Sequence, residues 1–226
     1  MVINDIDHPI KFRPKTNKKQ KIFILINGVN KTMEIPVALI IWSIPSLVYL
    51  FVRRIRKEKW GKIFKNLGWV SCKPKYWLWA LGVIVILSLL SLLIGKLIPP
   101  EIVESPNLAH SQFVGMAPSF GVFLLILLNQ AIYIALGEEI FFRGLLGGWL
   151  MRKLDFMIGN SIQAVCFLLI HLPLLMVSTA LWPLLIVQFI AGFVFGWLRY
   201  VSGSILPAWS VHSLINALSI FFLAVL

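Results

Sequence analysis

The stretch Gly137-Glu138-Glu139-Ile140-Phe141-Phe142-Arg143 lies inside an apolar run that extends from Phe120 to Leu150. A carboxylate or a guanidinium at the centre of a membrane costs about 2.5–3.5 kcal/mol on insertion scales, so a chain keeps such groups there only with partners or with a function. Glu138, Glu139 and Arg143 therefore mark a candidate functional site inside a transmembrane helix.

The composition of the chain supports this interpretation. Of its 226 residues, 59% are hydrophobic and 13% are charged, and the mean hydropathy is +0.87. These values are typical of integral membrane proteins, and they predict an all-α fold, a polytopic transmembrane helical bundle of about six to eight membrane segments. The two cysteines, Cys72 and Cys166, are too few for a disulfide framework or a cysteine metal cluster.

The net charge of +12 is concentrated in two blocks. Of the 21 Lys and Arg residues, 16 lie before Thr32 or between Arg53 and Lys75. Basic blocks beside apolar spans are typical of cytoplasmic loops in contact with lipid headgroups, so we expect the lipid bilayer as a partner and no nucleic acid. We interpret residues 1–226 as a single membrane domain with a basic N-terminal segment (1–33), a basic interfacial loop (53–76) and a C-terminal core (119–226).

Six apolar runs are long enough to cross a membrane. We expect them at about residues 34–52, 77–98, 120–150, 156–176, 184–200 and 208–226. The run 120–150 is about 46 Å long as an α-helix, against about 30 Å of hydrocarbon, so it tilts strongly or breaks near Gly137. Gly192 and Gly196 have the spacing of a close helix contact. The aromatic residues between the charges of 53–76 predict a helix on the membrane surface.

The topology of residues 1–52 stays open. With the loop 53–76 inside, a single crossing by 34–52 places the seven basic residues of the N-terminal segment outside, against the positive-inside bias. Residues 22–52 either make a re-entrant or double pass, or depart from the rule.

Polar side chains recur at four-residue spacings within the apolar runs. Glu139 and Arg143 share a helical face and can pair, which leaves Glu138, about 100° further round the helix, free to face elsewhere. Counted from the cytoplasmic ends of their helices, Glu138 and His171 both lie roughly 21–22 Å deep, so antiparallel packing brings them level. The three motifs are Glu138-Glu139-x-x-x-Arg143, Phe167-x-x-x-His171 and His212-x-x-x-Asn216.

Together these groups suit amide hydrolysis. A carboxylate and a histidine in a low-dielectric cavity can remove a proton from water, and a second histidine with an amide can donate hydrogen bonds to an oxyanion. Each motif also has a structural interpretation: Glu139 with Arg143 as an ion pair, either histidine as a hydrogen bond between helices, Phe167 as packing. The occurrence of all three on separate spans favours a site.

In this order and on successive apolar helices, the three motifs resemble the CPBP family of intramembrane proteases (CaaX proteases and bacteriocin-processing enzymes, also called Abi), which includes the Ras-converting CaaX prenyl endopeptidases. The resemblance covers residues 120–226. It implies that Glu138, assisted by His171, activates water, that His212 and Asn216 form the oxyanion site, and that Glu139 and Arg143 support them.

The resemblance also implies an integral protein of a bacterial cell membrane, with its site open to the cytoplasm. Its substrate would be a membrane-associated protein or peptide, in CaaX-type processing, bacteriocin maturation or self-immunity. We favour a mechanism without a metal cofactor; the alternative is a zinc site of Glu138, His171 and His212, although no His-Glu-x-x-His motif is present. The competing functions are a non-catalytic scaffold or immunity protein, and a small proton-coupled transporter that uses Glu138. A transporter would be expected to show repeated halves.

Overall fold

The computed structural model describes residues 37–103, 105 and 107–225, and within them the chain is helical, without β-strands. Six apolar stretches are long enough to cross a membrane, which confirms the predicted bundle. The basic N-terminal segment lies outside the described residues. The spans are α2 (Val37–Ile55), α4 (Lys75–Gly95), the third span (Phe120–Lys153), α9 with α10 (Phe156–Val177), η4 with α11 (Thr179–Ser202) and α12 (Leu206–Ala224).

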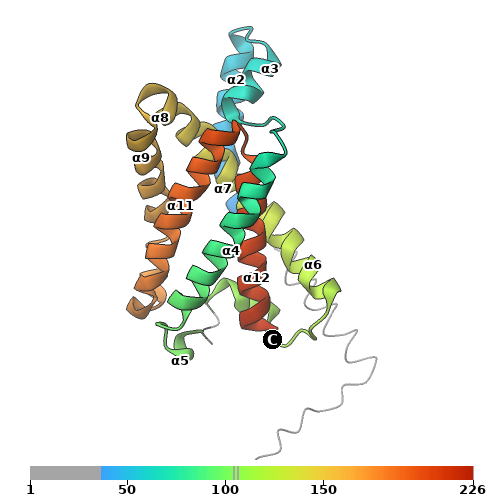
Figure 1. Ribbon diagram of the computed structural model, residues 1–226, viewed down its shortest axis with the longest axis vertical. Coiled ribbons are helices and arrows are strands. Elements are labelled where there is room, and N and C mark those ends of the chain that lie inside the picture. The colour runs from blue at the N-terminus through green and yellow to red at the C-terminus, as the bar shows by residue number, and fades with distance from the viewer. Residues whose placement is uncertain (1–36, 104, 106, 226) are drawn as a thin grey trace, which may run out of the picture.

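The third span is one continuous helix in which two segments are wound as π-helix. It consists of α6 (Phe120–Asn129), η2 (Gln130–Ala135), α7 (Leu136–Glu138), η3 (Glu139–Gly147) and α8 (Gly148–Lys153), of which η2 and η3 are π-helical. It does not break at Gly137, and it crosses the bundle obliquely from α6 to α8 (Figure 1). A Cβ at Gly137 would lie 2.8 Å from the Cα of Leu39, so this glycine permits the close approach of α2.

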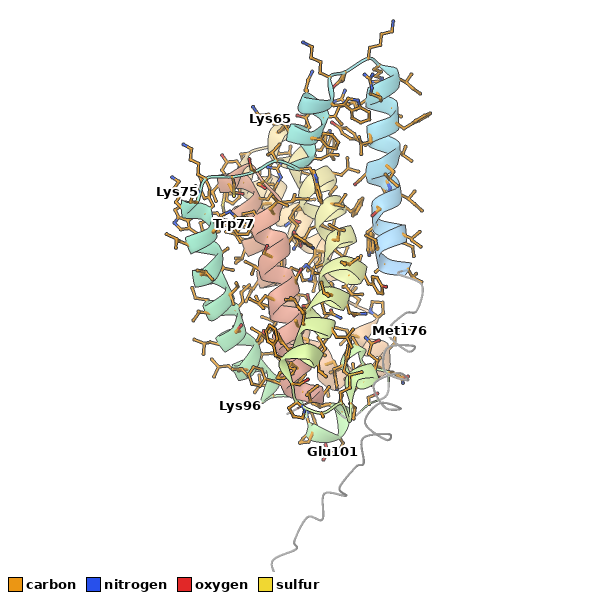
Figure 2. All side chains as sticks on the ribbon, turned by 90° about the vertical axis from the view of Figure 1, so that its right-hand side faces the viewer. Lys65, Lys75, Trp77, Lys96, Glu101 and Met176 are labelled. Atoms are coloured by element: carbon orange, nitrogen blue, oxygen red, sulfur yellow. The ribbon has the colours of Figure 1, made fainter. Side chains whose placement is uncertain are left out.

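Basic residues gather at one end of the bundle. Lys65 and Lys75 lie at that end, and Lys96, Glu101 and Met176 lie at the opposite end (Figure 2). The faces of α2 and α4 that point away from the bundle expose apolar side chains such as Phe51 and Leu78. The bundle therefore has one basic end, and its apolar outer faces suit a membrane environment.

The predicted surface helix forms as α3 (Trp60–Leu67) and docks on the basic end. Ile63 and Leu67 are buried, whereas Trp60 is exposed. The carbonyl oxygen of Asn66 accepts hydrogen bonds from Arg152 at 3.0 Å and Arg199 at 3.3 Å. Cations at this position suit a helix C-terminus, where backbone carbonyls lack partners.

The close helix contact predicted at Gly192 and Gly196 is present, and it joins α9 (Phe156–Leu169) to α11 (Trp182–Ser202). A Cβ at Gly196 would lie only 1.8 Å from Oδ1 of Asn160. Asn160 donates to the carbonyl of Phe193 at 2.9 Å, and Gln163 donates to the carbonyl of Gly192 at 2.7 Å and to Asn160 at 3.2 Å. We call Asn160 and Gln163 the amide cluster; both are fully buried.

Helix α12 packs against α4, α11, α6 and η2, so it lies at the centre of the bundle. Its start is buried: Ser204 is 0% exposed, and the backbone N–H of Ile205 donates to the carbonyl of Gly68 at 2.9 Å. The chain that follows α3 therefore covers the beginning of α12. This depth places His212 well inside the bundle although it is close to the helix start in sequence.

The remaining short helices are α5 (Pro100–Val103), η1 (Ala109–Phe113), α10 (Leu174–Val177) and η4 (Thr179–Leu181).

Candidate active site

The candidate site lies where the third span faces α9, α11 and α12. The two glutamates fall at the junction of α7 and η3, where the winding changes from α to π. Single π-helical turns are frequent at functional sites because they change the direction in which successive side chains point. Both glutamates and Arg143 are buried here, and His212 meets them from α12. We call Glu138, Glu139, Arg143 and His212 the charged cluster.

The predicted pair of Glu139 and Arg143 forms. Nη1 of Arg143 lies 2.9 Å from Oε1 of Glu139, and both side chains are 0% exposed. The guanidinium also lies between two aromatic rings, 4.1 Å from the centroid of Phe167 and 5.1 Å from that of Phe195. Among the described residues, none of its three nitrogens has a partner with hydrogen-bond geometry. Arg143 is therefore held by opposite charge and by cation–π contact.

His212 lies between the two glutamates, a contact that the sequence did not predict. Its Nδ1–H donates to Oε1 of Glu139 at 2.9 Å, and its Nε2 lies 3.8 Å from Oε2 of Glu138. The hydrogen bond to Glu139 fixes the imidazole ring. Oε2 of Glu138 is buried and has no hydrogen-bond partner among the described residues. The carboxylate left free by the Glu139 pair thus faces an imidazole nitrogen at an ion-pair distance that is too long for a direct hydrogen bond.

His171 is placed differently from the expectation. Its Nδ1–H donates to the carbonyl of Phe167 at 2.8 Å, and in the described part of the chain no hydrogen bond or ion pair joins it to Glu138. The imidazole of His171 packs on the ring of Phe167, with ring centroids 4.8 Å apart. The centroid of the same Phe167 ring lies 6.0 Å from that of His212. Phe167 thus packs against both histidine rings.

Asn216 lies one turn beyond His212 on α12 and is half-buried. Its Nδ2–H donates to Oε1 of Gln130 at 3.3 Å. Gln130 is 3% exposed and was missed in the sequence, although a lone glutamine in an apolar run is a visible signal. Phe195 was also missed, and no motif distinguishes it from other apolar residues of its helix.

The charges of the cluster do not cancel without a proton. With both carboxylates ionised, Arg143 balances one, and a buried unpaired charge is costly. A single proton shared by Oε2 of Glu138 and Nε2 of His212 would make the cluster neutral. A proton at a buried carboxylate is what a general acid–base catalyst requires.

The zinc alternative can be compared with this geometry. Both histidines donate Nδ1–H to fixed acceptors and keep Nε2 available, as metal-bound histidines do. Within residues 37–225, apart from 104 and 106, no three His, Cys, Asp or Glu side chains are grouped to hold a metal ion. Glu138 and His212 form a pair of candidate ligands, and a three-ligand site would require His171 to approach them.

Comparisons with known proteins address the same region. Residues 120–218 match the model of a family described as Rce1-like, type II CAAX prenyl endopeptidase. The match spans the motifs of all four candidate catalytic residues and confirms the resemblance inferred from them. No curated protein and no solved structure matches the chain.

Proposed function

We infer that the protein is a CAAX-type intramembrane protease, because residues 120–218 match the model of the Rce1-like, type II CAAX prenyl endopeptidase family, and we propose that Glu138 activates its water. The observation that carries this proposal is the unpaired Oε2 of Glu138 opposite Nε2 of His212 at 3.8 Å, in a buried cluster. A buried carboxylate oxygen that accepts no hydrogen bond inside a membrane protein is free to exchange a proton.

In the proposed reaction, the carboxylate of Glu138 takes a proton from a water molecule. The resulting hydroxide attacks the carbonyl carbon of the scissile bond, and the carbonyl oxygen becomes an oxyanion. The proton on Glu138 then passes to the amide nitrogen as the C–N bond breaks, which releases an amine and a carboxylic acid, and the acid then loses its proton to solvent. Glu139 and Arg143 keep the imidazole of His212 in place throughout, through the hydrogen bond at 2.9 Å.

Asn216 and His212 are the proposed donors to the oxyanion. One N–H of the Asn216 carboxamide is used by Gln130, and the second is available to a substrate oxygen. His212 uses Nδ1–H for Glu139, so it can donate from Nε2 only when that nitrogen carries the shared proton. Such donors stabilise charge that exists only in the transition state.

His171, which packs on the ring of Phe167, is proposed to assist Glu138. The bond to the Phe167 carbonyl fixes its tautomer with Nε2 as the free nitrogen. That nitrogen can accept or return a proton during the reaction. If zinc is present, Glu138, His171 and His212 would hold it, and it would supply a more acidic bound water.

We propose that substrates reach the site from the cytoplasmic end. A cavity of about 220 Å³ is lined by Tyr49, Phe141, Gly144, Trp149 and Arg152, among others, and a second of about 200 Å³ is lined by Ser46, Phe64 and Ile140, among others. Leu67 of α3 lines both. Both cavities lie against η3, the segment that begins with Glu139. These cavities suit apolar portions of a membrane-associated protein or peptide. The proposed substrates are a prenylated CAAX peptide, a bacteriocin precursor or an immunity target. The proposed location is a bacterial cell membrane.

The test is cleavage by the purified protein in liposomes. A prenylated peptide that ends in a CAAX sequence is incubated with it, with and without a chelator, and the products are identified by mass spectrometry. We expect one cleaved peptide bond and the same rate with chelator. About one zinc per chain by elemental analysis, lost in both His171→Ala and His212→Ala, would overturn the metal-independent mechanism. Proton flux across the liposome without cleavage would support the transporter alternative.

A further inference from the structure

The geometry points to Gln130 as a positioning residue that orients the Asn216 carboxamide toward the reacting carbonyl. This inference rests on the proposed function, because it concerns the donor that Asn216 would supply. In the described part of the chain, no hydrogen bond or ion pair joins Gln130 to the charged cluster, and we expect it to act through Asn216 alone.

Both ends of the Gln130 carboxamide are engaged. Its Oε1 accepts from Nδ2 of Asn216 at 3.3 Å, and its Nε2 donates to Oδ1 of Asn129 at 2.9 Å. In this arrangement the nitrogen end of the Gln130 carboxamide faces Asn129 and its oxygen end faces Asn216. The Asn216 amide must then turn its nitrogen toward Gln130, which leaves its second N–H for another acceptor.

The backbone at Gln130 is built to keep this contact. Gln130 is the first residue of the π-helical segment η2, and it is 3% exposed. A second hydrogen bond ties the same segment to α12, from Nε1 of Trp209 to the carbonyl of Ala131 at 2.8 Å. Trp209, His212 and Asn216 lie on one face of α12 at spacings of three and four residues. The face that carries the proposed donors is thus anchored to the span that carries Glu138.

A carboxamide without such a partner rotates freely and can present its oxygen instead of its nitrogen to a developing oxyanion. An oxygen at that position repels the negative charge, so the orientation determines whether Asn216 helps or hinders. Small misplacements of a catalytic group can lower a rate by about 10²-fold. Loss of the Gln130 oxygen should therefore reduce kcat and leave KM almost unchanged.

The experiment is a double-mutant cycle on peptide cleavage by the full-length protein in liposomes. We expect Gln130→Leu to lower kcat by about ten- to a hundredfold. In the Asn216→Ala background the same substitution should change kcat by less than about twofold, because the group through which it acts is gone. Gln130→Asn is the second variant, to be used if Gln130→Leu does not fold. It keeps a carboxamide but withdraws it by one methylene, so its kcat should fall as well.

Gln163→Leu is the matched control. Gln163 is also a fully buried glutamine with hydrogen bonds to a neighbouring helix, but it belongs to the amide cluster. Its substitution should lower the melting temperature and leave kcat of the folded protein unchanged.

The outcomes separate the two proposals. If the kcat losses of Gln130→Leu and Asn216→Ala multiply in the double variant, the two residues act independently and the role of Gln130 is overturned. It is also overturned if kcat/KM falls only in proportion to the melting temperature. In both cases the proposed protease function stands. A wild-type protein that cleaves no peptide overturns the proposed function, and with it this inference. Equal kcat for Gln130→Asn and wild type also overturns the role of Gln130.

Discussion

Two clusters of buried polar side chains lie between the spans, and they differ in how completely their atoms are paired. In the amide cluster, both donors reach carbonyl oxygens of α11, and only Oε1 of Gln163 lacks a partner. In the charged cluster, one oxygen of each glutamate and all three nitrogens of Arg143 lack hydrogen bonds. Hydrogen-bonded neutral amides join helices, whereas incompletely paired charges keep their capacity to react.

The clusters also differ in what surrounds them. The amide cluster faces two glycines, Gly192 and Gly196, so the backbones of α9 and α11 supply its partners. The charged cluster faces the aromatic rings of Phe167 and Phe195, which offer Arg143 no acceptor atoms. A substitution in the first cluster should therefore change stability alone, and one in the second should change activity, stability or both.

The largest effect is expected at Glu138. Glu138→Ala should lower the cleavage rate by about 10²–10⁴-fold, because it removes the general base. Stability should change little, since Oε2 of Glu138 has no hydrogen bond to lose. Cleavage rate and melting temperature are measured on the same preparation in detergent.

Glu138→Gln is the accompanying control, because it keeps the shape of the side chain without the basic oxygen pair. It should be as inactive as the alanine variant. Turnover at the wild-type rate in either variant would contradict the role of Glu138.

The second effect concerns the ion pair. Arg143→Ala leaves Glu139 as a buried charge without its cation, which should cost about 3–5 kcal/mol of unfolding free energy. Glu139→Ala should cost a similar amount, and the double variant should cost less than the sum of the two. Thermal unfolding in detergent measures all three. Melting temperatures equal to that of Glu138→Ala would show that the contact at 2.9 Å contributes nothing to stability.

Local patterns explain why much of this could be predicted from the sequence. The six spans follow from hydropathy, the pair of Glu139 and Arg143 follows from the four-residue helical repeat, and the contact at Gly196 follows from its spacing to Gly192. Each depends on one stretch of chain. The match of residues 120–218 to a protease family agrees with the order of the three motifs.

Contacts between helices were not predictable in the same way. Residue counting placed His171 level with Glu138, but it gives depth and not direction around the helix axis. The π-helical segments η2 and η3 alter the direction of side chains around the axis of the third span, and no residue pattern predicted these segments. As a result His212, and not His171, contacts the glutamates, and Gln130 meets Asn216.

The third effect concerns the oxyanion donor. Asn216→Ala should lower kcat by about 10²–10³-fold and barely change KM, because the donor acts on charge that develops in the transition state. His212→Ala should be at least as severe, since it also removes the partner of both glutamates. A rise in KM at constant kcat in Asn216→Ala would instead indicate ordinary substrate binding. Steady-state kinetics on the liposome assay distinguish these results.

The smallest effect is expected in the amide cluster. In Gly196→Ala the new Cβ meets Oδ1 of Asn160 at 1.8 Å, so the side chain must move and the hydrogen bond to the Phe193 carbonyl weakens. Overpacking of this kind costs about 1–3 kcal/mol. Gly82→Ala in α4 is the matched control, because nothing lies within 4 Å of its Cβ position, and alanine in a helix interior is about 0.5–1 kcal/mol better than glycine. We expect the first variant to melt at a lower temperature than wild type and the second at an equal or higher one, with kcat per folded molecule unchanged in both. A loss of kcat in Gly196→Ala without a loss of stability would mean that the amide cluster takes part in catalysis, and the contrast between the two clusters would fail.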